Sequence, residues 1–95
     1  MYISLEKNKD EIGRKFIFDQ QGLDAFAAHL KGLRKVLGFT KSQLAFEASL
    51  SLSQIALIES AKINHTLSTF FAIARALNVP IETLFKFSLP DSKRN

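Results

Sequence analysis

Two polar signatures eleven residues apart, Thr40 with Gln43 and Ser51 with Gln54, constrain the fold more than any other feature of this chain. In each signature a hydroxyl side chain caps the start of a helix, and the side chain of a Gln three residues later accepts a hydrogen bond from the backbone amide of the capping residue. The helix that begins after Thr40 is expected to end near Ala48, just before the polar break around Ser51. We therefore expect two short helices joined by a tight turn in the middle of the chain.

Apolar residues at helical spacing predict a longer helix before this pair and two further helices after it. The first helix is opened by Asp24 and stopped by Gly38, and its apolar stripe consists of Phe26, Leu30, Leu33 and Leu37. A fourth helix follows Thr66 and ends at Asn78, which suits a left-handed terminus. Pro80 suits the first turn of a brief fifth helix. The residues expected to face the core from the last two helices are Leu67, Phe70, Ile73, Ala74, Leu77, Ile81, Leu84 and Phe85.

The expected fold class is all-α, with a compact five-helix domain over residues 23–88. An arm over residues 1–22 precedes it, and a flexible basic tail over residues 89–95 follows it. Two structures of the arm fit the sequence: Asn8 with Glu11 suggests a capped helix, whereas Tyr2–Leu5 and Lys15–Phe18 suggest the strands of a short hairpin. With 46% hydrophobic residues, the 95-residue chain can bury one core of its own.

Composition excludes several classes of function. The chain has no Cys, which excludes a disulfide framework, a thiolate nucleophile and any metal site that needs Cys ligands. Its two histidines, His29 and His65, lie far apart, so we expect no metal and no cofactor; His29 is interpreted as a surface or boundary residue. Neither a Gly-rich phosphate loop nor a nucleophile with a spaced His and acid is present, so we do not expect an enzyme. No apolar run is long enough to cross a membrane, and we expect a cytoplasmic protein.

The positive charge is concentrated in the middle of the chain. The whole sequence has 13 basic and 9 acidic side chains, a net charge of +4. Between residues 31 and 62 there are five basic residues and two acidic ones, Glu47 and Glu59. An anionic partner such as nucleic acid would be attracted by this surplus, although ordinary solvated lysines explain the charge equally well.

The run from Leu33 to Phe85 resembles the Cro and phage-repressor (XRE-type) helix-turn-helix family. The resemblance implies a lambda-repressor-like fold and a sequence-specific, double-stranded DNA-binding transcriptional regulator. It also implies a homodimer that places its third helix, about residues 51–60, in the major groove. Phe71 and Phe87 are candidates for the dimer contact. The matching landmark residues are Leu33, Arg34, Gly38, Thr40, Leu44, Ala45, Ala48, Ser51, Ile55, Ile58, Glu59, Leu67, Ala72, Ala76, Leu77 and Val79.

Three residues depart from the family pattern. Ser49 and Ala61 stand where the family favours Gly, and His65 stands where it favours Pro. A non-Gly residue in a left-handed conformation costs on the order of 1 kcal/mol. Ser49 and Ala61 therefore predict either small local strain or altered turns.

The resemblance also assigns roles to individual residues. Lys41 replaces a family Gln that binds a phosphate, and Lys62 and Asn64 follow the third helix where relatives contact the DNA backbone. Leu52, Ser53 and Leu57 stand where relatives touch bases. A Gln can bind adenine and a Leu can pack on a thymine methyl group. The predicted DNA-binding residues are Thr40, Lys41, Ser51, Leu52, Ser53, Gln54, Leu57, Lys62, Asn64 and Thr66; Arg34 with Glu59 is the predicted structural ion pair, and no catalytic or metal residue is predicted.

An alternative function follows from the apolar character of the presumed reading face. Leu52, Ala56 and Leu57 make it less polar than a helix that reads bases usually is. Exposed apolar patches usually have partners. The same fold could then serve as an antitoxin-like or accessory module whose third helix contacts a protein.

Overall fold

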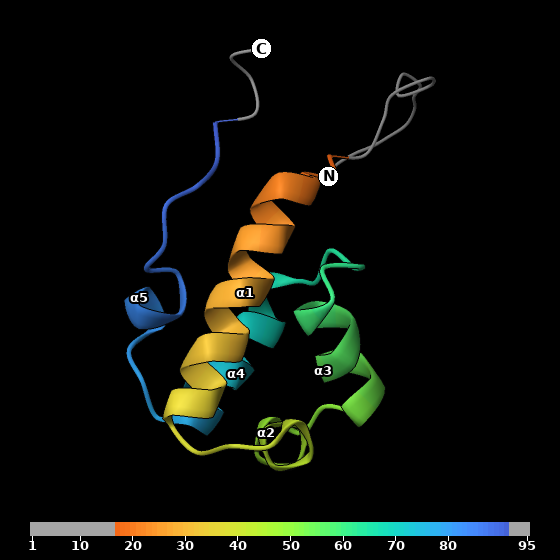
Figure 1. The fold of residues 1–95 in the computed structure, drawn as a ribbon. Coiled ribbons are helices and arrows are strands. Elements are labelled where there is room, and N and C mark those ends of the chain that lie inside the picture. Colours follow the sequence, from red (N-terminus) through yellow and green to blue (C-terminus); the bar gives the residue numbers. More distant parts are fainter. Residues whose placement is uncertain (1–16, 92–95) are drawn as a thin grey trace, which may run out of the picture.

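A computed structural model describes residues 17–91 of the chain, which form five α-helices (Figure 1). The helices are α1 (Gln20–Val36), α2 (Lys41–Ala48), α3 (Leu52–Glu59), α4 (Leu67–Leu77) and α5 (Ile81–Leu84). The expected all-α five-helix fold is confirmed. Most of the arm, where a hairpin and a helix both fitted the sequence, lies outside the described residues.

The five helices enclose one apolar core. α1 is the longest helix and contacts α3 and α5, while α2 contacts both α3 and α4 (Figure 1). The completely buried side chains come from all five helices: Leu30, Leu44, Ile55, Ile73 and Leu84. Phe26 lies among Phe70, Phe85 and Phe87, with ring centroids 5.1, 5.5 and 6.0 Å away. Because every helix contributes to the same core, the position of α3 depends on the whole bundle.

α1 begins one turn earlier than the sequence predicted. We expected Asp24 to open the helix, but it starts at Gln20 with Asp19 as its N-cap. The Asp19 carboxylate accepts a hydrogen bond from the Gly22 amide at 2.9 Å. A Cβ on Gly22 would lie 2.8 Å from the Asp19 Oδ2 atom, so a larger residue at this position would have to shift the capping carboxylate. The segment Gln20–Gly22 of the predicted arm is therefore part of α1.

The end of α1 follows the prediction except at Leu37. Gly38 adopts a positive φ of 85° and stops the helix. Its amide donates to the Lys35 carbonyl, and the Phe39 amide donates to the Arg34 carbonyl. Leu37, expected in the buried stripe, is 41% exposed because it is the C-cap residue and has left the helical period.

Two apolar residues expected in the core lie outside it. Leu67 is 60% exposed and Ile81 is 36% exposed. Each is the first residue of its helix, where the side chain lies beyond the edge of the packed face. Phe85 is also 40% exposed, although its ring still contacts Phe26 and Phe70. The periodicity identified the buried faces correctly but placed their edges one residue too far out.

The turns after α2, α3 and α4 all contain a left-handed residue. Ser49, Ala61 and Asn78 have φ values of 59°, 59° and 57°. The left-handed end predicted at Asn78 is therefore confirmed. Ser49 and Ala61 keep the turns for which the family favours Gly, so the chain tolerates a strain on the order of 1 kcal/mol at each position.

Candidate DNA-binding surface

The start of α2 is built by the first capping box. The Thr40 hydroxyl accepts a hydrogen bond from the backbone amide of Gln43 at 3.0 Å, and the Gln43 Oε1 atom accepts one from the backbone amide of Thr40 at 2.8 Å. Lys41 is the first residue of α2, and its side chain is exposed. Since the amides at a helix start carry partial positive charge, a Lys here is unfavourable unless an anion lies nearby. This position is suited to a phosphate group.

The start of α3 repeats the arrangement. The Ser51 hydroxyl accepts from the Gln54 amide at 3.0 Å, and the Gln54 Oε1 atom accepts from the Ser51 amide at 2.9 Å. Gln54 therefore caps the helix, and its Oε1 atom already has one partner. Its Nε2 group remains available to donate a hydrogen bond to an oxygen atom of a base or a phosphate.

The two sides of α3 differ sharply in burial. Ile55 and Ile58 are buried on the inner side, whereas Leu52 is 50% exposed and Leu57 is 37% exposed. Ser53 is also exposed. The structure thus leaves the outer side of α3 open to a partner, and Leu57 is not a core residue.

A buried ion pair fixes α3 to α1. Arg34 Nε donates to Glu59 Oε2 at 2.6 Å, and Arg34 Nη2 donates to Glu59 Oε1 at 2.9 Å. Arg34 Nη1 also donates to the Phe39 carbonyl at 2.8 Å, which ties the turn before α2 to the same group. The hydrogen bond to Glu59 raises the pKa of Arg34 above its ordinary value. A bidentate pair of this kind restricts both the distance and the orientation of the two helices.

The loop between α3 and α4 contains three of the predicted contact residues, Lys62, Asn64 and Thr66, and all are exposed. Asn64 uses its Nδ2 group to donate to the Ile17 carbonyl at 3.1 Å. Thr66 is the N-cap of α4, as predicted, but its hydroxyl lies 3.3 Å from the Thr69 hydroxyl and caps no backbone amide. The free amides at the start of α4 therefore remain available to an anion.

His65 lies in the same loop and is half-buried. Burial lowers its pKa below the ordinary value of 6.5. Its Nε2 atom is inaccessible to solvent and has no hydrogen-bond partner among the described residues. A neutral His65 is therefore favoured in the folded protein at neutral pH.

Sequence reasoning missed the role of Gln20. Its Nε2 group donates to the Ala61 carbonyl at 3.0 Å and to Asp24 Oδ1 at 2.9 Å. Gln20 and Ala61 are 41 residues apart, so no local pattern could have paired them. His29, by contrast, is the boundary residue that was expected: its Nε2 group donates to the Thr83 carbonyl at 2.8 Å.

The two candidates for a dimer contact occupy different environments. Phe87 is half-buried and its ring lies 5.6 Å from the His29 ring, so it packs on its own domain. Phe71 is 39% exposed and lines an open cavity of about 270 Å³ with Ala74, Arg75, Val79 and Ile81. Of these two candidates, Phe71 is therefore the one that offers an apolar surface to a second molecule.

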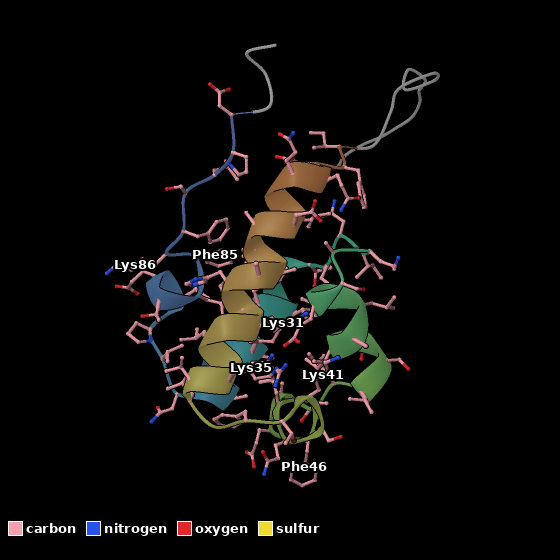
Figure 2. The ribbon with its side chains drawn as sticks, viewed as in Figure 1. Lys31, Lys35, Lys41, Phe46, Phe85 and Lys86 are labelled. Carbon is pink, nitrogen blue, oxygen red and sulfur yellow. The ribbon has the colours of Figure 1, made fainter. Side chains whose placement is uncertain are left out.

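Three exposed lysines lie on α1 and α2. Figure 2 shows Lys31 and Lys35 on α1 and Lys41 on α2. All three are exposed. Lys86 lies apart from them, on the segment that follows α5 (Figure 2).

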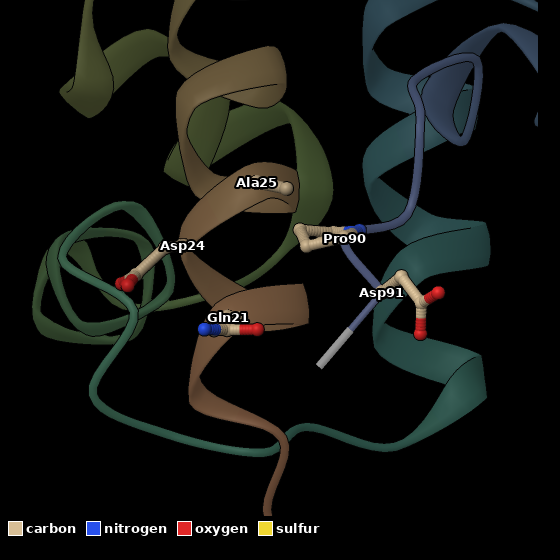
Figure 3. Close-up of a pocket in the computed structure, with 5 residues that line it drawn as sticks. All are labelled: Gln21, Asp24, Ala25, Pro90 and Asp91. Atoms are coloured by element: carbon tan, nitrogen blue, oxygen red, sulfur yellow. The ribbon is translucent and has the colours of Figure 1, made fainter. Parts of the chain in front are cut away.

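A second open cavity is lined in part by acidic side chains, unlike the mostly apolar cavity beside Phe71. It lies between the first turns of α1 and the segment after α5, has a volume of about 610 Å³ and is lined by Gln21, Asp24, Ala25, Pro90 and Asp91 (Figure 3). Its two carboxylates disfavour a phosphate ligand. In the part of the chain that the structure describes, no group of three metal-ligating side chains occurs. Nor do these residues include a helix with the length and apolarity that a membrane span requires.

The chain is similar to known helix-turn-helix proteins over most of the described region. The profile of the family described as Helix-turn-helix (HTH_3) matches residues 30–84. The restriction-modification controller protein C.AhdI from Aeromonas hydrophila is 30% identical, with a TM-score of 0.64 over 66% of this chain and 96% of that chain.

Two further crystal structures agree with this similarity. The wild-type controller protein C.Esp1396I is 26% identical, with a TM-score of 0.63 over 67% of this chain and 84% of that chain. An HTH_3 family transcriptional regulator from Vibrio cholerae is 26% identical, with a TM-score of 0.66 over 70% of this chain and 37% of that chain. No curated protein sequence matches the chain.

Proposed function

Because the chain belongs to the HTH_3 helix-turn-helix family of DNA-binding transcriptional regulators, we propose that it reads specific double-stranded DNA with α3 in the major groove. The observation that carries this proposal is the contrast between the two sides of α3. Its inner side is held by the core and by the Arg34–Glu59 pair, while Leu52, Ser53 and Leu57 are exposed on its outer side. A helix whose inner side is fixed by packing and whose outer side is exposed is suited to reading bases.

The residues around α3 supply candidate contacts to the DNA backbone. Lys41 and Lys62 are exposed cations at the start of α2 and in the loop after α3. The uncapped amides at the start of α4 are further donors for a phosphate oxygen. Such contacts position the protein, whereas contacts from Leu52, Ser53, Gln54 and Leu57 would select the sequence.

We propose that the regulator binds as a homodimer, through the surface around Phe71. One small module buries little DNA surface, and two half-sites about one helical turn apart would raise specificity. The restriction-modification controller protein C.AhdI matches this chain over 96% of its own length, which supports a regulatory role for this chain. We expect the present protein to act in the cytoplasm and to need no cofactor.

The proposed dimer surface is tested by Phe71→Ser. This change should shift the protein to a monomer in sedimentation and weaken its binding to paired half-sites, whereas an unchanged dimer would exclude this surface.

Selection of DNA ligands tests the proposed function directly. The purified protein is incubated with a pool of randomised duplexes at several salt concentrations, and the retained duplexes are sequenced. A motif with two-fold symmetry supports a dimeric, sequence-specific regulator. Retention without any motif contradicts specific reading, and no retention at low salt contradicts DNA binding itself.

A second candidate function is an antitoxin-like or accessory module whose α3 contacts a protein. The half-exposed side chains of Leu52 and Leu57 favour it, because an apolar outer side is typical of a protein interface. Leu57→Ser separates the two functions. If the variant keeps sequence-specific duplex binding but loses a protein partner identified with the wild type, the outer side of α3 serves the protein partner.

A further inference from the structure

Two hydrogen bonds join the start of α1 to the loop between α3 and α4. Gln20 Nε2 donates to the Ala61 carbonyl at 3.0 Å, and Asn64 Nδ2 donates to the Ile17 carbonyl at 3.1 Å. The loop passes beside the first half of α1 (Figure 1). Ile17 and Gln20 both precede residue 30, where the match to the family begins. The contacts therefore connect the family core to a part of this chain outside the matched segment.

Ala61 sets the direction in which the loop leaves α3. It is buried and left-handed, with a φ of 59°. Its amide donates to the Ile58 carbonyl and the Lys62 amide donates to the Leu57 carbonyl, so the turn is closed on its helix side. The bond from Gln20 holds the Ala61 carbonyl from outside the turn. Because the turn is held by hydrogen bonds on its helix side and by Gln20 on its outer side, the direction of the backbone at Lys62 is fixed.

Beyond Lys62 the loop has few backbone hydrogen bonds of its own, and Ile63 is the apolar side chain that packs against the core. None of the backbone hydrogen bonds recorded outside the helices for the described residues has residues 63–65 as a donor. Asn64 is instead held by its side chain to Ile17. Gln20 and Ile17 thus restrain the loop at both ends of the stretch that carries Lys62 and Asn64.

We propose that Gln20 is a positioning residue for DNA binding, which acts by holding the α3–α4 loop in the geometry that contacts the phosphate backbone. The proposal rests on the proposed function, because it assumes that this loop meets DNA. A loop that is already ordered loses less conformational freedom on binding, so the complex is tighter. Both N–H groups of the Gln20 amide are engaged, by Ala61 and by Asp24. No other side chain among the recorded hydrogen bonds of the described residues contacts the Ala61 carbonyl.

The test compares Gln20→Met with Gln21→Met. Met has a similar length and helix propensity to Gln but no donor. Gln21 is the neighbouring exposed Gln on the same turn and lines the cavity beside Asp24 and Pro90. Binding of each variant to the selected duplex is measured by titration, together with the Tm and the ¹⁵N order parameters of residues 62–66.

We expect Gln20→Met to weaken duplex binding by about twofold to tenfold, the factor expected when one neutral hydrogen bond is lost. The order parameters of residues 62–66 should decrease in the free variant, and Gln21→Met should match the wild type. In the Gln20→Met background, Lys62→Ala should have a smaller effect than in the wild type, because both changes affect the same contact. A purely structural role would lower the Tm without this non-additivity.

Two outcomes overturn the proposal in different ways. If the wild type and Gln20→Met bind the duplex equally and show the same loop order, Gln20 does not position the loop. If the wild type binds no duplex at low salt, the proposed function fails, and the positioning role fails with it. The order parameters are measured without DNA, so a change in loop order separates the two failures.

Discussion

The guanidinium group of Arg34 on α1 and the carboxylate of Glu59 at the end of α3 form a bidentate, buried ion pair. Their nitrogen–oxygen distances are 2.6 and 2.9 Å, and the two side chains are 7% and 1% exposed. Hydrogen bonding to Glu59 outweighs burial and raises the pKa of Arg34, so the guanidinium group stays charged. Because the pair connects the helix before the turn to the proposed recognition helix, we expect its loss to affect both stability and the proposed DNA binding.

Removing one partner of this pair should strongly destabilise the domain. Arg34→Met leaves the Glu59 carboxylate buried without its cation, which costs about 3–5 kcal/mol in the free energy of unfolding. Urea denaturation followed by circular dichroism measures this loss. The double variant Arg34→Met with Glu59→Leu should recover most of it, because no uncompensated charge remains. If the double variant is less stable than Arg34→Met, the unpaired Glu59 carboxylate is not the main cause of the loss.

Replacing Ser49 by Gly should stabilise the domain. Ser49 is exposed and left-handed, with a φ of 59°. Gly relieves a backbone strain of about 1–2 kcal/mol in the folded state. It also makes the unfolded chain more flexible, which lowers the free energy of unfolding by about 0.5–1 kcal/mol. We expect a net gain of up to about 1 kcal/mol in urea denaturation. Ala61→Gly is the comparison: its methyl group is buried and its loss offsets the relief, so its effect should be close to zero. Equal gains at both positions would contradict this explanation.

Lys41→Ala should weaken DNA binding through one phosphate contact. The slope of log K against log salt concentration should become shallower by about one unit, and all sequences should be affected alike. Lys86→Ala is the matched control, because Lys86 is an exposed lysine on the segment after α5 (Figure 2). An unchanged slope for Lys41→Ala, or the same change for both variants, would remove Lys41 from the phosphate contacts.

Acid should destabilise the domain partly through His65. Burial lowers the pKa of His65 in the folded state below 6.5, so the unfolded chain binds a proton at a higher pH than the folded chain. Its contribution to stability is complete above about pH 6.5 and is lost as the pH falls through the folded pKa. Between pH 7.5 and 5.5 the Tm of the wild type should therefore decrease more than that of His65→Gln. Parallel pH profiles would show that His65 does not titrate in this way.

The helix ends that depend on neighbouring residues were predicted well. The two capping boxes and the left-handed Asn78 lie where the sequence placed them. Each uses contacts between residues no more than four positions apart. The start of α1 was misplaced, because Asp19 and Asp24 are both acceptable N-caps by local criteria. The choice of the earlier start brings Gln20 to the Ala61 carbonyl, a contact that no short pattern contains.

For the candidate DNA-binding surface, the sequence alone was enough to name the residues on the outer side of α3 and at the start of α2. It did so through the resemblance to the helix-turn-helix family, whereas capping, a local property of the chain, placed the starts of α2 and α3. Only the tertiary structure decided that Asn64 is already engaged by Ile17, 47 positions away, and that the Ala61 carbonyl is engaged by Gln20, 41 positions away. Pairs so distant in sequence meet only because the helices bury one common core, and the packing of that core sets their geometry.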